Sequence, residues 1–140
     1  MQHIKNFFNT RNPFAQHLGI EVTDITTHSA TARMELGPSH ANPFGTANAG
    51  SIFSLAETAF GAAANAGGNM AVAVNLSISY LKPGISGMLT ARANEVSQGG
   101  PLASYEVTVF DENDQAIAHA TAMAYRRKES LPVPDGTDGS

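Results

Sequence analysis

Residues 42–65 read NPFGTANAGSIFSLAETAFGAAAN, a turn rich in Asn, Pro and Gly followed by a segment of almost only apolar or small residues. Asn48 is a good N-cap, so the sequence predicts a helix that starts after it and runs to Asn65 or Gly67. Glu57, at the middle, is the only charged side chain of this stretch. Because a solvated helix normally carries several charges, this helix is predicted to be buried.

Length and composition indicate one domain. The chain has 140 residues, 42% of them apolar, which is enough for a single core. We expect this domain to span residues 1–127, with a short helical segment at 1–18 and a flexible C-terminal tail at 128–140. The residues expected to dock the N-terminal segment are apolar: Ile4, Phe7, Phe8, Phe14 and Leu18.

Charge and residue usage exclude several kinds of protein. The net charge of −4 and the pI near 5.6 argue against nucleic-acid binding. The chain has no cysteine, so thiol nucleophiles, disulfides and Cys-ligated metals are excluded. No apolar run reaches the length of a membrane span and the N-terminus lacks the order of a signal peptide, so we expect no membrane partner and a cytoplasmic location.

The remaining segments alternate with a period of two, which is typical of strands. A hairpin is predicted at 20–25 and 30–36, and strands at 72–80, 88–97, 103–110 and 115–126. One face of the strand after the helix is expected to hold Val72, Val74, Leu76, Ile78 and Tyr80. The last strand has a row of small residues that would let the helix approach closely: Ala116, Ala118, Ala120, Ala122 and Ala124. The sequence therefore predicts an α+β fold, an antiparallel sheet wrapped around one long central helix.

Polar or small residues form one stripe along the predicted helix: Gly50, Ser54, Glu57, Thr58, Gly61 and Asn65. The stripe could face solvent, contact another helix in an oligomer, or form a site. A carboxylate alone among apolar and small neighbours is desolvated, which raises its pKa. Such a group suits general-base or nucleophilic chemistry, so Glu57 is a candidate catalytic residue, with Gly50, Ser54 and Thr58 as candidate substrate contacts.

The start of the helix offers a second catalytic element. Its first backbone N–H groups are unpaired and the helix dipole is positive there, so a carbonyl oxygen placed at residues 49–51 would be polarised. Glu57 lies eight residues after Ala49, roughly 12 Å along an ideal helix axis. Either the turn before the helix folds back toward Glu57, or one chain supplies the helix start and another chain supplies Glu57. The second arrangement predicts a dimer.

The run from His40 to Gly61, HANPFGTANAGSIFSLAETAFG, resembles the hotdog-fold acyl-CoA thioesterases of the PaaI type, whose pattern is H-x-N-x-x-G-x-x-H-G-G followed by S-L-A-D. The resemblance covers about residues 15–127. It implies a hotdog fold, chains that pair through their sheets as a dimer or a dimer of dimers, and an acyl-CoA bound at the dimer interface. It also implies Glu57 as base or nucleophile, the N–H of Ala49 as oxyanion donor, and Asn42 as a group that orients the carbonyl or water.

Three positions depart from that pattern. Glu57 stands in place of Asp, but related hotdog thioesterases of the 4-hydroxybenzoyl-CoA kind carry Glu there. Asn48 stands in place of the motif His; it retains a capping side chain and is a candidate substrate contact. Ala49 stands in place of the first Gly; it keeps its N–H but adds a methyl group beside the thioester path.

Other polar residues have both a functional and an ordinary interpretation. His40 and His119 lack metal-ligand spacing, so structural or surface roles are favoured and no metal or cofactor is expected. Asn75 could touch a ligand or be a plain sheet-face amide. The cations that could hold coenzyme A phosphates, or simply solubilise the surface, are Lys82, Arg92, Arg126 and Arg127.

The sequence thus predicts an acyl-CoA thioesterase that hydrolyses a medium-sized or aromatic acyl-CoA to the free acid and CoA. One alternative is a non-catalytic acyl-CoA-binding or scaffold protein. Another is a hydratase or dehydratase of the same fold, although such sites usually pair an acid with a histidine.

Overall fold

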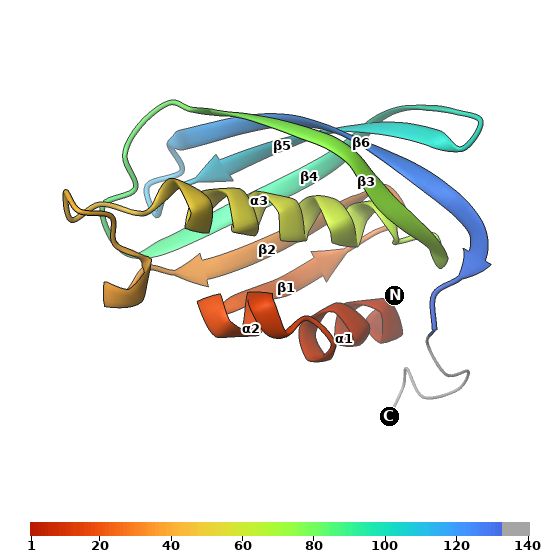
Figure 1. Ribbon diagram of the computed structural model, residues 1–140, viewed down its shortest axis with the longest axis horizontal. Coiled ribbons are helices and arrows are strands. Elements are labelled where there is room, and N and C mark those ends of the chain that lie inside the picture. The colour runs from red at the N-terminus through yellow and green to blue at the C-terminus, as the bar shows by residue number, and fades with distance from the viewer. Residues whose placement is uncertain (133–140) are drawn as a thin grey trace.

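The computed structural model describes residues 1–132. A six-stranded antiparallel sheet of order β1-β2-β4-β5-β6-β3 curls around one central helix, α3 (Figure 1). This confirms the predicted α+β hotdog fold. The elements are α1 Gln2–Thr10, α2 Pro13–Leu18, β1 Ile20–Ile25, β2 Ser29–Glu35, a 3-10 turn Pro38–His40, α3 Ala49–Ala64, β3 Asn69–Tyr80, β4 Met88–Gly99, β5 Leu102–Phe110 and β6 Ala116–Ser130.

Helix α3 begins and packs as its sequence predicts. The side chain of Asn48 accepts a hydrogen bond from the N–H of Gly50 at 2.7 Å, which makes Asn48 the N-cap. Leu55 and Phe60 are 0% and 1% exposed. Burying such side chains contributes about 1.5–3 kcal/mol each, so the apolar side of α3 is a principal source of stability.

The alanine row of β6 faces the core, as expected. Ala118, Ala120, Ala122 and Ala124 are buried, and Ala116 is half-buried. Side chains this small let sheet and helix lie close together while the interior stays densely packed. The row therefore helps the sheet to curl around a single helix.

Strand β3 breaks the simple alternation. Its pairing with β6 skips Val74, which forms a β-bulge. A bulge offsets the alternation of side chains by one residue. Two residues an even number of positions apart, which would normally share a face, therefore point to opposite faces when the bulge lies between them. Leu76 and Ile78 pack against the core, whereas Val72 lies opposite Tyr125 on the outer face. The expectation that Val72 and Val74 share the face of Leu76 and Ile78 is therefore wrong.

The N-terminal helices pack beside β1 (Figure 1). Ile4 is buried, and Phe8 and Leu18 pack partly buried against the core, as expected. Phe14 is 64% exposed, so its predicted docking role is wrong. Phe14 follows the first residue of the short helix α2, whose buried residue is Ala15 instead.

The C-terminal boundary also differs from the expectation. Strand β6 continues to Ser130, so residues 128–130 belong to the sheet and not to a tail. The N–H of Leu131 donates to the carbonyl of Gly68 at 2.8 Å. Residues 133–140 of the expected tail lie outside the described residues. Within residues 1–132, no helix is long and apolar enough to cross a membrane.

A polar cluster joins three strands at the far end of the sheet. The guanidinium of Arg126 donates to Glu95 at 2.8 Å and to the hydroxyl of Tyr105 at 2.6 Å. The side chains of Glu95 and Arg126 are only 12% and 20% exposed, and His28 lies 3.5 Å from Glu95. Burial alone would raise the pKa of Glu95, but hydrogen bonds and charges from Arg126 and His28 outweigh it and hold that pKa below its usual range.

Replacing Glu95→Gln should lower the free energy of unfolding at pH 7 by about 1–3 kcal/mol, because Arg126 then lacks its charged partner. Since the folded-state pKa is depressed, the contribution of Glu95 is complete above its ordinary pKa of 4.5 and disappears as pH falls through the folded value. Urea unfolding of both proteins from pH 7 to pH 3 measures this difference. A difference that stays constant over this range, or one equal to that of the exposed control Glu106→Gln, would contradict the assignment.

Candidate active site

The N-terminal end of α3 opens onto a groove of about 350 Å³. The groove is bordered by the loop that follows His40, the first turn of α3 and the end of β3. Its lining includes Asn42, Thr46, Ala47, Ala49, Ile52, Tyr80, Leu81, Lys82 and Pro83. Three residues predicted from the sequence, Asn42, Ala49 and Lys82, are thus brought together.

The backbone N–H of Ala49 is the available donor at this end of α3. The N–H of Gly50 donates to the Asn48 side chain at 2.7 Å, and those of Ser51 and Ile52 donate to the Asn48 carbonyl at 3.0 and 3.2 Å. Ala49 is exposed, and its N–H has no partner among residues 1–132. The Asn48 cap therefore leaves one helix N–H, at the positive end of the dipole, for an incoming oxygen.

Asn42 supports the loop with its whole carboxamide. The amide nitrogen donates to the Thr46 hydroxyl at 2.8 Å and to the Ala47 carbonyl at 3.3 Å. The amide oxygen accepts from the N–H groups of Phe44 and Thr46 at 2.9 and 3.1 Å. Since an amide offers two donor hydrogens and two lone pairs, these bonds use its full capacity. The contacts observed for Asn42 thus shape the groove, whereas the sequence predicts a contact with the carbonyl or water.

Tyr80 was not predicted as a site residue. Its hydroxyl donates to the carbonyl of Ala49 at 3.0 Å, which ties the end of β3 to the first turn of α3. Desolvation by burial raises the pKa of Tyr80, so the phenol stays protonated and remains a donor. The alternation of the strand places Tyr80 on the same face as Leu76 and Ile78. This pattern predicts which face Tyr80 occupies, but it does not predict the contact with Ala49.

Glu57 lies in the middle of α3, outside the groove. Its side chain is exposed on the single chain, and no group in the described part of the chain donates a hydrogen bond to its carboxylate. Nearby protein atoms nevertheless desolvate it and raise the pKa of Glu57, as its sequence context predicts. The loop before α3 makes no hydrogen bond to Glu57, so the folded-back arrangement is not observed. Glu57 and the Ala49 N–H stay apart within one chain.

The other stripe residues are held by the helix itself. The hydroxyl of Ser54 donates to the Gly50 carbonyl, and that of Thr58 to the Ser54 carbonyl, both at 2.7 Å. Their hydroxyl hydrogens are thus used, and each oxygen can only accept. Thr58 is 5% exposed in the single chain, whereas Asn48 and Gly50 lie at the surface beside the groove.

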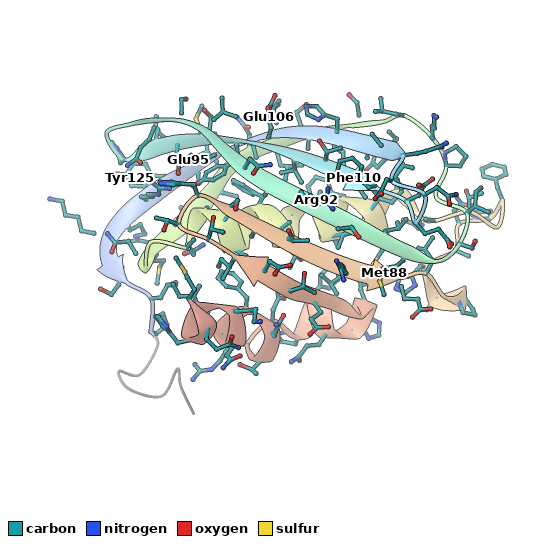
Figure 2. The ribbon with its side chains drawn as sticks, turned by 180° about the vertical axis from the view of Figure 1, so that it is seen from behind. Met88, Arg92, Glu95, Glu106, Phe110 and Tyr125 are labelled. Carbon is teal, nitrogen blue, oxygen red and sulfur yellow. The ribbon has the colours of Figure 1, made fainter. Side chains whose placement is uncertain are left out.

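The structure does not bring the remaining candidates to the groove. Asn75 lies opposite Met123 on the outer face of the sheet. Arg92 lies on that same face, with its guanidinium 5.1 Å from the ring centre of Phe110, and Figure 2 shows this face free of helices. Both therefore lie on the opposite side of the sheet from α3.

A second, larger cavity of about 790 Å³ lies at the other end of β3 and β6. Its lining includes Arg126 and Arg127, both predicted as phosphate-binding candidates. Arg126 is engaged by Glu95, and Arg127 pairs with Glu129 at 3.3 Å on the surface. These two cations are therefore partly neutralised by protein carboxylates.

The two histidines considered from the sequence have structural contacts. His40 is buried; its Nδ1 accepts from the Gly37 N–H at 2.9 Å and its Nε2 donates to the Leu18 carbonyl at 2.6 Å. His119 contacts the Thr108 hydroxyl at 3.2 Å. In the described ranges, no three His, Asp or Glu side chains gather as a metal-binding group.

A curled antiparallel sheet around one apolar helix, with a lone carboxylate on that helix and a groove at its N-terminus, defines a hotdog-fold protein with a site suited to carbonyl chemistry. The family model described as thioesterase superfamily matches residues 44–118, more than half of the chain. The chain belongs to this superfamily.

Individual relatives agree with this assignment. A proposed esterase of Archaeoglobus fulgidus is 30% identical over 133 residues, 94% of this chain and 86% of that protein. Acyl-coenzyme A thioesterase PaaI of Escherichia coli is 31% identical over 113 residues, 80% of this chain and 81% of that protein. A solved structure of the E. coli PaaI protein from the phenylacetic acid degradation operon matches with TM-score 0.83 and 27% identity, covering 93% of this chain and 99% of that one. A Streptococcus mutans protein solved bound to acetyl CoA matches with TM-score 0.75 and 26% identity, covering 80% and 91%.

Replacing Glu57→Gln should raise the stability of the folded protein slightly, by up to about 0.5 kcal/mol at pH 7, because the amide carries no charge to desolvate. Since the folded pKa of this carboxyl is raised, wild type should lose stability as pH rises from its ordinary pKa of 4.5 through the folded value, and the variant should not. Thermal melts from pH 4 to pH 8 test this. Equal pH dependence in both proteins would show that Glu57 is an ordinary solvated residue.

Proposed function

We propose that the protein hydrolyses acyl-CoA thioesters, of medium-sized or aromatic acyl groups, to the free acid and CoA. The observation that carries the proposal is the unpaired Ala49 N–H, which lies at the positive end of α3 and lines a groove. A lone, desolvated carboxylate on the same helix supplies the second catalytic group. An oxyanion donor together with a carboxylate that acts as base or nucleophile can catalyse thioester hydrolysis.

The two groups act on different atoms of the thioester. The thioester carbonyl oxygen accepts a hydrogen bond from the Ala49 N–H, which stabilises the negative charge that forms on this oxygen. Glu57 either takes a proton from the water that attacks the carbonyl carbon or attacks that carbon itself, forming an anhydride that water then hydrolyses. In both routes the C–S bond breaks, the CoA sulfur leaves as thiolate and takes up a proton, and the acid is released.

Two chains share each site in this proposal. Glu57 lies outside the groove that Ala49 lines, and α3 holds the two about two helical turns apart. Strand β3 ends the sheet and leaves one edge without a strand partner in the single chain. An open edge of this kind can pair with a second copy, so pairing through β3 would set the Glu57 of one chain against the Ala49 N–H of its partner.

The comparisons support the substrate class. The E. coli relative is named an acyl-coenzyme A thioesterase, and the S. mutans structure contains acetyl CoA. Lys82 at the mouth of the groove is exposed and suits an anionic cofactor tail. A hydratase mechanism is less well supported, because no hydrogen bond or ion pair joins Glu57 to a histidine within residues 1–132.

Release of CoA from a panel of acyl-CoAs should fall about 100-fold or more in Glu57→Gln, the usual scale of general-base or nucleophilic catalysis. Ala49→Pro should lower kcat about 100- to 1,000-fold, because it removes the N–H that is proposed to bind the oxyanion. Proline suits this first helical position, and Asn48 before it is already extended at φ −62° and ψ 135°.

Two matched controls are available in this chain. Ala49→Gly retains the N–H and should retain activity, and Glu35→Gln removes an exposed carboxylate on the outer face of strand β2. Binding of acyl-CoA with no wild-type turnover would instead identify a non-catalytic acyl-CoA-binding protein. Full activity in Ala49→Pro would remove the oxyanion role.

Mixing the two inactive variants tests whether a site is shared. A heterodimer of Glu57→Gln and Ala49→Pro contains one site built from two intact halves. Co-expressed variants that pair at random should therefore recover about one quarter of wild-type activity. Size-exclusion chromatography with light scattering verifies that the variants form dimers. A co-expressed dimer that remains as inactive as its parents would show that each chain uses its own two groups.

A further inference from the structure

Gly61 lies one helical turn after Glu57, in the interior of α3. A Cβ added there would lie 3.8 Å from Glu57 Oε2 and 4.0 Å from Phe8 Cε1, both ordinary van der Waals distances. Alanine would therefore fit without displacing any neighbour in the single chain. Because glycine lowers helix stability relative to alanine, packing within the chain does not account for the missing side chain.

The space at Gly61 has one polar wall and one apolar wall. The carboxylate of Glu57 borders one side, and the ring edge of Phe8 from α1 borders the other. Phe8 is only partly buried; it packs against the core and meets Phe7 edge to face, with ring centres 5.6 Å apart. Its position is thus fixed while part of its surface remains open.

The two arms of a thioester differ in polarity, and so do the two surfaces near the site. The pantetheine and phosphates of CoA are polar or charged, which suits the groove with the exposed cation Lys82. The acyl arm is apolar, and it begins at the carbonyl carbon on which Glu57 is proposed to act. The partly buried aromatic surface beside Glu57 is that of Phe8, and aromatic or aliphatic groups pack favourably on such a ring.

We propose that Phe8 and Gly61 form the acyl-binding wall of the site and set the preference for acyl size. This inference rests on the proposed function and adds the residues that select the substrate. The N-terminal helix α1, which the sequence suggested only as a docked segment, then takes part in recognition. Gly61 leaves room for the acyl group beside the carboxylate, and Phe8 supplies its apolar contact.

Steady-state hydrolysis of acetyl-CoA, hexanoyl-CoA and benzoyl-CoA tests the proposal. Phe8→Ala should lower kcat/KM for hexanoyl-CoA and benzoyl-CoA by about 10-fold or more, and for acetyl-CoA by no more than about twofold. Phe8→Leu, which keeps an apolar side chain, should recover part of the loss. Phe14→Ala is the matched control, since Phe14 is an exposed phenylalanine on the neighbouring helix α2.

Gly61→Ala provides a second readout that does not depend on the folding of Phe8→Ala. It should raise the melting temperature and at the same time lower kcat/KM for benzoyl-CoA more than for acetyl-CoA. An equal loss for all three substrates in both variants would overturn the proposal and leave Phe8 a structural residue. Failure of the proposed function looks different, because wild-type protein would then release no CoA from any of the three.

Discussion

Burial of a helix that has almost no charged side chain is the constraint on which the rest of this structure depends. Helix α3 carries one charge in sixteen residues, and ten of those residues are buried. Such a helix is stable in water only when other elements cover most of its circumference. A six-stranded sheet does so by curling, and the alanine row of β6 gives the close approach that the curl requires.

The same burial fixes the geometry of the helix N-terminus. Because its apolar side packs against the sheet, α3 cannot rotate about its axis. Its first turn follows the loop that Asn42 stabilises by hydrogen bonds. Asn48 then satisfies three of the first four N–H groups, one through its side chain and two through its carbonyl. The cap that stabilises the helix therefore also selects Ala49 as the free donor. The stability of the helix and the geometry of the proposed oxyanion site therefore come from one local arrangement.

Much of this was readable from the sequence, because hydrophobic periodicity and capping are local signals. The helix and its cap, the hairpin before it and the strands after it follow from spacing, as does the isolation of Glu57. Contacts between distant segments were not readable. The bulge at Val74 offsets the alternation of β3, although no Gly or Pro marks it in the sequence. Phe14 is apolar, as expected of a docking residue, but it lies at the surface. Tyr80 and Phe8 lie beside the proposed site because of contacts between segments that are distant in the sequence.

The environment of Glu57 is the observation in the single chain that most favours the proposed two-chain site. Its carboxylate is desolvated enough to have a raised pKa, yet it is exposed and receives no hydrogen bond from residues 1–132. A carboxylate in that condition lowers stability, and no contact within residues 1–132 compensates for it. In the proposed two-chain site, the helix N-terminus of the second copy would face Glu57, and the removal of water there would strengthen its field. The proposed two-chain site would thus give this unfavourable carboxylate a function.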